Sequence, residues 1–238
     1  PAEAGAEDEG EQATLRALRR GAFARRAIAK GERISQEDLD LAIPLEEDQI
    51  TANDLSKYTD LFALEPIPEG DAVFGKAVRR VHNREKVMEI VKRAKALVAQ
   101  SKVVVPGRAD FEISHHYGIE RFDEVGTTLI TIVNRDYCKK LIIQLPDQVH
   151  PEQHHLRKEE TFHVLYGRLR LSLDGEESEH GPGDVITVQP GVKHAFSSDT
   201  GAVIEEISST HYADDSRYTD PAILENKHRK TYLTYWMD

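Results

Sequence analysis

The sequence predicts a mainly β protein with a smaller helical share: a small β domain, a connecting helix and a larger antiparallel β barrel. Three observations predict this class. Residues 83–101 carry apolar residues at three- and four-residue steps, the period of an amphipathic helix. From residue 112 onward, short apolar runs alternate with Gly, Pro and Asp turns at intervals of about 8–12 residues, which is typical of barrels and sandwiches. Residues 15–78 form a separate block with strand and turn signals of its own.

The chain begins with an expected acidic linker, residues 1–12, whose small and acidic composition favours disorder. The small β domain follows at residues 13–80. It has a strand in GAFARRAIAK and a second strand broken by the Pro-Glu-Gly turn at residues 68–70. Ser35, with Asp38 three residues later, is a capping-box-like start for a short helix, and ITANDLSKY supplies another cap and turn.

A helical connector is predicted at residues 81–111. Its apolar stripe predicts one buried face, made of Val87, Ile90, Val91, Ala94, Leu97 and Val98. A helix with such a stripe more often packs on its own protein than on a partner. A short strand after the helix is expected to end at Pro106-Gly107.

The barrel is predicted at residues 112–238. Its strands are TTLITIVN, KKLIIQLP, TFHVLYGRLRLSLDGEE, DVITVQP and AVIEEISS. Asp174-Gly175 is a strong tight-hairpin signal. The terminal segment TYLTYW is expected to close a sheet edge.

Composition narrows the function classes. The formal net charge is −11, so nucleic acid and anionic membranes are not expected partners. No apolar run reaches the roughly 20 residues of a membrane helix, and the acidic start does not resemble a signal peptide. The single cysteine, Cys138, excludes an intrachain disulfide and is expected to be an inert core thiol. We therefore expect a cytoplasmic protein. The start at Pro1 instead of methionine suggests a piece of a longer polypeptide.

Two segments, HHLRKEETFHVLYG and PGDVITVQPGVKHAF, contain a candidate metal site. Side chains alternate along a strand, so Gln153 and His155 share one face. Glu160 begins the next strand and can meet His155 across the pair, and His194 follows the Pro190-Gly191 turn. Imidazole and carboxylate suit a divalent metal such as Mn, Zn, Fe or Ni. Two histidines, a glutamate and a weak neutral donor would leave positions open for water or substrate.

Other polar residues near these segments have competing interpretations. His150 is the reserve ligand should Gln153 not bind. Lys158 is a candidate to hold a sugar hydroxyl or anionic group, and Glu206 a candidate proton shuttle; an ordinary surface charge is the alternative for both. His154 and His163 are expected to face away from the metal. The remaining histidines are expected to be solvated: His82, His115, His116, His180, His211 and His228.

The two segments resemble the two halves of the cupin signature, G-x5-H-x-H-x4-E-x6-G and G-x5-P-x-G-x2-H-x3-N. The matches are His155, Glu160, Gly167, Gly183, Gly191 and His194. The departures are Asp147, Gln153, Gln189 and Ser198, which stand where the signature has Gly, His, Pro and Asn. The resemblance implies a double-stranded β-helix, or jelly-roll, barrel with one metal and, by family analogy, a homodimer. A cupin that has lost its metal is the competing interpretation.

The stretch RRGAFARRAIAKGERISQEDLDLAIP resembles the SAF (antifreeze-like) domain of sialic acid synthases, over roughly residues 15–78. In that family the domain follows a TIM-barrel synthase domain that condenses phosphoenolpyruvate with an N-acylated hexosamine, and some members carry a cupin after it. The family's Arg-Pro-Gly segment corresponds to Ile43, Pro44 and Leu45, so the arginine is missing here. The segments HPEQHHLRKEETF and EEISSTHYADDSRY are in turn similar to sugar isomerases of the D-lyxose isomerase type. There, a lysine matching Lys158 touches the sugar.

Three hypotheses follow. The first is a SAF–cupin tail of a sialic-acid-synthase-like protein in nonulosonate or surface-carbohydrate biosynthesis. Its parent would carry an N-terminal TIM-barrel synthase domain, and its cupin would bind a metal and a sugar or amino sugar. The second is a metal-dependent cupin aldose–ketose isomerase or epimerase that acts by itself. The third is a non-catalytic sugar-binding or dimerisation module. The sequence ranks the first ahead, with the second as a possible activity of its barrel.

Overall fold

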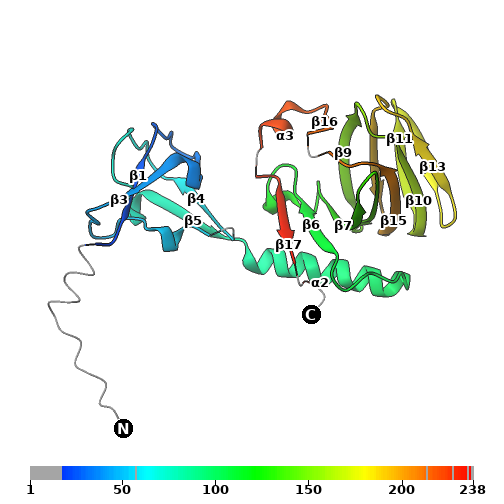
Figure 1. Ribbon diagram of the computed structural model, residues 1–238, viewed down its shortest axis with the longest axis horizontal. Coiled ribbons are helices and arrows are strands. Elements are labelled where there is room, and N and C mark those ends of the chain that lie inside the picture. Colours follow the sequence, from blue (N-terminus) through cyan, green and yellow to red (C-terminus); the bar gives the residue numbers. More distant parts are fainter. Residues whose placement is uncertain (1–17, 57, 213, 227, 235, 237–238) are drawn as a thin grey trace, which may run out of the picture. The chain divides into compact units, whose positions relative to one another are not determined.

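The structure is a computed structural model that describes residues 18–56, 58–212, 214–226, 228–234 and 236. The predicted acidic linker, residues 1–12, lies outside the described residues. The chain divides into two compact units, Pro1–Glu85 and Lys86–Asp238 (Figure 1). The mainly β prediction is confirmed by the strands of both units.

The first unit contains two small antiparallel sheets. One pairs β1 (Gly21–Ala24) with β3 (Leu39–Ala42), and the other joins β2 (Arg33–Ile34), β4 (Thr59–Ala63) and β5 (Val78–His82) in the order β2-β4-β5. Alternating side chains of these strands enter one apolar core, which includes Ala22, Ala24, Leu39, Leu61 and Ala63. The core is small, so turns and caps take a larger part in holding the unit together.

The predicted capping box forms at the short 3-10 helix Gln36–Asp38. The Asp38 carboxylate accepts hydrogen bonds from the Ser35 backbone N–H at 2.8 Å and from the Ser35 hydroxyl at 2.7 Å. Thr51 and Asp54 repeat this arrangement at the 3-10 helix Ala52–Asp54. Each carboxylate satisfies donors that a short helix would otherwise leave free.

The long helix is α2 (Arg84–Ser101), and its bounds agree closely with the predicted residues 83–101. All six residues of the predicted stripe are buried. Figure 1 shows α2 running along one end of the strands of the second unit. Lys86 and Arg93 both form ion pairs with Asp123 of a barrel loop. The helix therefore packs on its own barrel, as the stripe predicts.

Two sheets build the second unit. The larger has the order β13-β10-β15-β8-β7-β6-β17. Its strands are β13 (Val185–Val188), β10 (Glu160–Gly167), β15 (Ala202–Ser209), β8 (Tyr137–Gln144), β7 (Thr127–Asn134), β6 (Asp110–Ser114) and β17 (Lys230–Leu233). The smaller has the order β12-β11-β14-β9-β16. Its strands are β12 (Glu176–His180), β11 (Leu169–Leu173), β14 (His194–Ser198), β9 (Gln148–His155) and β16 (Ser216–Tyr218). A short helix, α3 (Pro221–Glu225), precedes β17.

The two sheets face each other across a shared apolar core. Phe162 and Ile204 enter it from the larger sheet, and Leu171 and Phe196 from the smaller. Such face-to-face packing of two antiparallel sheets is the jelly-roll arrangement that the sequence predicts. The predicted Asp174-Gly175 hairpin joins β11 to β12, with positive φ angles of 48° and 88° at its two central residues. The predicted edge strand near the C-terminus is β17.

One predicted strand is wrong. The residues after α2, Lys102–Val105, form no strand, and Val104 is 89% exposed. An apolar run of three valines favours a strand locally, but no neighbouring strand pairs with it. Within the described part of the chain, no helix has the length and apolarity needed to span a bilayer.

Candidate metal centre and active site

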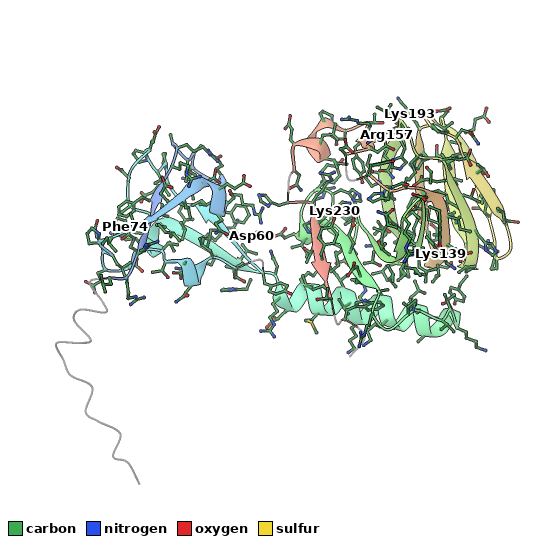
Figure 2. All side chains as sticks on the ribbon, in the orientation of Figure 1. Asp60, Phe74, Lys139, Arg157, Lys193 and Lys230 are labelled. Carbon is green, nitrogen blue, oxygen red and sulfur yellow. The ribbon has the colours of Figure 1, made fainter. Side chains whose placement is uncertain are left out.

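The metal candidates come together at one end of the barrel interior. His155 ends β9, Glu160 begins β10 and His194 begins β14. Each offers one ligand atom, and these atoms all lie within 4.8 Å of one another. Figure 2 places Arg157 and Lys193, in the loops that lead into β10 and β14, at the same end of the second unit. The backbone N–H of Gly191 donates to the His155 carbonyl at 2.7 Å and so ties these loops together.

Contacts among the three side chains are close. His155 Nε2 lies 3.3 Å from Glu160 Oε1, and His194 Nε2 lies 3.2 Å from Glu160 Oε2. All three side chains are buried. Hydrogen bonding by the second ring nitrogen orients an imidazole. His194 Nδ1 lies 3.1 Å from the Val192 carbonyl, and His155 Nδ1 faces Asp215 Oδ2 at 3.9 Å. The contact with Val192 therefore orients the His194 ring with its Nε2 toward Glu160, and His155 presents its Nε2 to the same carboxylate.

Gln153 lies beside the same cluster. It is buried opposite His194 in the β9–β14 register, and its Nε2 is 3.4 Å from His194 Nε2. Its Oε1 is buried without a hydrogen-bond partner, as are Glu160 Oε2 and His155 Nε2. Buried acceptors without partners are costly unless something binds them. The residues present therefore fit a divalent cation.

A bulge in β9 determines which of its residues face inward. Gln153 pairs with His194 and His150 pairs with Phe196, so β9 has one more residue than β14 between these pairs. Pro151 and Glu152 are half-buried there, whereas both His150 and Gln153 are buried. The extra residue shifts the alternation by one position. His150 consequently faces the interior too, where its ring stacks on Phe196 with centroids 4.4 Å apart.

Lys158 is buried, which rules out the alternative of an exposed surface charge. Its Nζ donates to Glu206 Oε1 at 3.0 Å and also pairs with Glu160 Oε1. Burial alone would lower the pKa of Lys158, but the charges of Glu206 and Glu160 outweigh it and raise that pKa. Burial likewise opposes ionisation of Glu160, yet the Lys158 ammonium and the two histidines hold the pKa of that carboxyl well below its usual range.

Glu206 faces inward as the alternation of β15 predicts, while Glu205 points outward. The Ser208 hydroxyl donates to Glu206 Oε1 at 3.1 Å. Burial raises the pKa of Glu206, but the neighbouring Lys158 ammonium lowers it more, and the net direction is downward. Glu206 is thus a buried, ionised carboxylate that is held in place by two donors.

Asp215 is a site residue that the sequence analysis missed. It is buried and accepts hydrogen bonds from the backbone N–H groups of Leu156 at 3.2 Å and Lys158 at 3.1 Å. It thereby fixes the loop that carries Lys158, and it faces His155. Its only sequence signal is an acidic pair before a short strand, which resembles many surface loops.

One cavity is lined by five of these residues: Gln153, His155, Lys158, Glu160 and Glu206. Its empty space is about 450 Å³ with the open solvent at its mouth included. Its walls also contain residues from strands far apart in the sequence: Glu112, Ser114, Thr127, Leu129, Lys140, Ile142, His150, Phe162, Phe196, His211, Ser216, Tyr218 and Lys230.

Several predictions for the other histidines are wrong. His115 and His116 are buried, 7% and 0% exposed, and were expected to be solvated. Their neighbours in sequence are polar, but β6 and the following turn carry them into the barrel. His116 Nε2 lies 3.2 Å from the Tyr218 hydroxyl. His211 lines the cavity as well. His154 and His163 are only half-buried and point away from the cluster, as predicted.

Comparisons with known proteins identify both halves of the chain. A SAF domain model matches residues 19–79, and a cupin domain model matches residues 141–206. The chain therefore contains a SAF domain and a cupin domain.

Among curated proteins, the chain is similar to the D-lyxose/D-mannose isomerase of Thermosediminibacter oceani. The two are 27% identical over 169 residues, which cover 59% of this chain and 90% of that protein. It is also similar to the D-lyxose ketol-isomerase of Cohnella laeviribosi, with 28% identity over 169 residues and the same two coverages. These relatives favour the isomerase alternative over the synthase-tail hypothesis that the sequence ranked first. They lend no support to descent from a sialic acid synthase.

Among solved structures, the chain resembles the L-ribose isomerases of Geodermatophilus obscurus and Cellulomonas parahominis. Both have a TM-score of 0.51 at 15% identity and match 61% of this chain. The match covers 96% of the first structure and 95% of the second, which was solved with L-ribose. At this identity the likeness shows a shared fold.

Proposed function

We propose that the cupin barrel is a metal-dependent aldose–ketose isomerase acting on a monosaccharide. The observation that carries this proposal is the convergence of His155, Glu160 and His194 beside a cavity whose lining includes the Lys158–Glu206 pair. A bound cation can polarise a carbonyl, an ammonium can stabilise charge on a sugar oxygen, and an ionised carboxylate can accept a proton. The D-lyxose isomerase relatives support the choice of a sugar substrate.

The metal would be held by His155, Glu160 and His194, with the Gln153 amide oxygen as a weaker fourth donor. When bound, a divalent ion supplies polarisation of a carbonyl or hydroxyl group. Manganese, zinc, iron and nickel all suit this donor set. Three strong donors and one weak donor would leave coordination positions open for substrate, as in other catalytic metal sites.

Glu206 is the proposed proton carrier. Isomerisation of an aldose to a ketose moves one proton from C2 to C1 and a second proton from the C2 hydroxyl to the carbonyl oxygen at C1. Glu206 is ionised at neutral pH because Lys158 lowers its pKa, so it is ready to accept the proton. Ser208 and Lys158 both contact Oε1, which leaves Oε2 as the oxygen available to the substrate.

Lys158 is proposed to orient the sugar and to stabilise negative charge that develops on its oxygens. Its ammonium has three protons and already contacts two carboxylates. A third contact remains for a substrate oxygen. The surrounding burial excludes water and strengthens this charge–charge interaction.

Deuterium exchange tests the proposal. The protein is loaded with Mn²⁺ and incubated in D₂O with D-lyxose, D-mannose and a panel of other hexoses and hexosamines. We expect solvent deuterium at C1 or C2 of at least one sugar, measured by NMR. Glu206→Gln should slow this exchange by about 10²–10⁴-fold, the usual contribution of a general base.

The matched control is Glu205→Gln, because Glu205 is the adjacent carboxylate on the outer face of the same strand. It should exchange deuterium at the wild-type rate. If metal-loaded protein leaves every sugar free of deuterium, the isomerase assignment is wrong, and a non-catalytic sugar-binding module becomes the better interpretation.

A further inference from the structure

We propose that the sugar bound in this cavity carries an anionic substituent, a phosphate or a carboxylate, and that Lys140 binds it. The inference rests on the proposed isomerase function and specifies the substrate class. Lys140 lies on β8, directly across from Glu206 of β15 in the strand register, so it reaches the same cavity from the neighbouring strand.

Lys140 is a buried lysine whose ammonium has no direct ion-pair partner among the described residues. The residue is only 4% exposed and lines the cavity. The opposite charge that acts on it is Glu206, across the strand pair, whose pKa it helps to lower without a contact at hydrogen-bond distance. Lys158 and Lys230, the other lysines that line the cavity, each have a carboxylate partner; Lys230 pairs with Glu112 at 2.8 Å. A buried charge is costly unless it is paired. Glu206 already accepts from Lys158 and Ser208, so an anion in direct contact with Lys140 is expected to arrive with a ligand.

The charge balance of the cavity points the same way. Its described lining has three carboxylates and three ammonium groups, contributed by Glu112, Glu160 and Glu206 and by Lys140, Lys158 and Lys230. These charges cancel. A divalent cation on the three metal ligands adds two positive charges to a buried space. A neutral sugar would leave that excess in place, whereas a phosphate or carboxylate would offset it.

His211 supplies a second group at the same place. The residue is half-buried, and its ring Nδ1 is buried without a hydrogen-bond partner. Burial, followed by the nearby charge of Lys140, lowers the pKa of His211 to about 4. The ring is thus neutral at physiological pH and, with one N–H, able to donate a hydrogen bond beside the ammonium.

Lys139 serves as a natural internal control. It is adjacent to Lys140 in sequence but points to the outer face, where it pairs with Glu205 at 2.6 Å. A substitution there changes the same charge on the same strand without touching the cavity.

The experiment compares D-mannose, D-mannose 6-phosphate and D-mannuronate with the Mn²⁺-loaded protein. Affinities come from titration calorimetry, and exchange rates come from deuterium incorporation. We expect at least one anionic sugar to be preferred over D-mannose by about 10–100-fold, the range for a hydrogen bond to a charged group. The two anionic arms distinguish phosphate from carboxylate.

Lys140→Met should abolish this preference while leaving the affinity for D-mannose within about threefold of wild type. Lys139→Met should keep the preference. Equal affinity for all three sugars in the wild type would overturn the proposal. Equal loss of neutral and anionic sugars in Lys140→Met would also overturn it, because Lys140 would then serve the sugar ring or the fold. Circular dichroism checks that each variant is folded. If Lys140→Met is unfolded, Lys140→Gln replaces it. If both variants are unfolded, the preference of the wild-type protein for anionic sugars decides the question.

The two proposals fail separately. If no sugar exchanges deuterium, the isomerase assignment fails, but calorimetry still shows whether anionic sugars bind better through Lys140. If D-mannose exchanges deuterium and the anionic sugars neither bind nor react better, the isomerase stands and the anion inference fails.

Discussion

The inner and outer faces of the larger barrel sheet carry the same side-chain chemistry in different surroundings. On the outer face, Lys139 pairs with Glu205 beside solvent, and their side chains are 39% and 17% exposed. On the inner face, Lys158 pairs with Glu206 and Glu160, and all three are about 3% exposed. Exposed pairs contribute little because water competes for both partners. In a buried pair, removal of one charge leaves the other buried and unpaired, which strongly destabilises the fold. The comparison shows that, of these two sets of charges, the one that is buried is the one that lines the cavity.

The most severe way to break this comparison is Lys158→Met. It leaves Glu160 and Glu206 buried without their cation, so we expect a loss of about 3–5 kcal/mol in the free energy of unfolding. Urea unfolding of the chelator-treated protein measures it. Lys139→Met is the outer-face counterpart and should cost less than about 1 kcal/mol. Equal losses for the two variants would show that burial does not separate the faces.

Glu160→Gln tests whether the inner-face cluster binds metal. Removing the only carboxylate among the three candidate ligands should weaken divalent-metal affinity by about 100-fold or more, at least as much as the loss of a residue that supports a ligand. Metal content after dialysis and calorimetric titration with Mn²⁺ are the measurements. Glu205→Gln should retain wild-type metal content. Undiminished affinity in Glu160→Gln would show that the cluster is not the metal site.

Lowering the pH should reduce the free energy of unfolding through His116, which is buried inside the barrel. Burial lowers the pKa of His116 to about 3, while its ordinary value in the unfolded chain is about 6.5. Between these values the unfolded chain binds a proton that the folded chain excludes, so stability falls as pH falls. The contribution is about 1.4 kcal/mol per pH unit from pH 6 to pH 4. His116→Phe should flatten the stability profile by that slope; an unchanged slope would show that His116 is protonated in the folded barrel.

Gln153→His replaces a weak metal ligand on the inner side of the barrel with a strong one. Imidazole binds Zn²⁺ and Ni²⁺ better than an amide oxygen does, so we expect affinity for either ion to rise by about tenfold. Competition with a chromophoric chelator measures the affinity. No change would indicate that residue 153 does not contact the metal.

Glu205→Gln is expected to have the smallest effect. Lys139 and His163 hold the pKa of the Glu205 carboxyl below its usual range, but all these groups touch solvent. The free energy of unfolding at pH 7 should change by less than about 1 kcal/mol. A larger loss would mean that the outer pair, too, is structurally essential.

Local patterns in the sequence predict much of this molecule. Strand alternation correctly orients Gln153, His155, Glu160 and Glu206, because facing is a local property of a strand with one buried side. The stripe of α2 and the Asp174-Gly175 hairpin are local for the same reason.

The remainder of the site depends on non-local pairing. Lys140 and His211 reach the cavity from segments whose position follows from sheet order, and no short motif marks them. Asp215 acts through hydrogen bonds to the backbone of a distant loop. The inward position of His150 depends on one extra residue in β9, which strict alternation does not anticipate. The expectation of a synthase tail came from the occurrence of SAF and cupin domains together in one protein family, and not from the residues of a site.

The extra residue at Pro151-Glu152 has a consequence for changes in the length of β9. A strand that lost one of these two residues would match β14 residue for residue between Phe196 and His194, and regular alternation would still turn His150 and Gln153 inward. The deletion would instead remove the local bend and extra twist that a bulge gives a strand. It would therefore change where the Gln153 amide lies relative to His194, and not which face of the sheet it occupies.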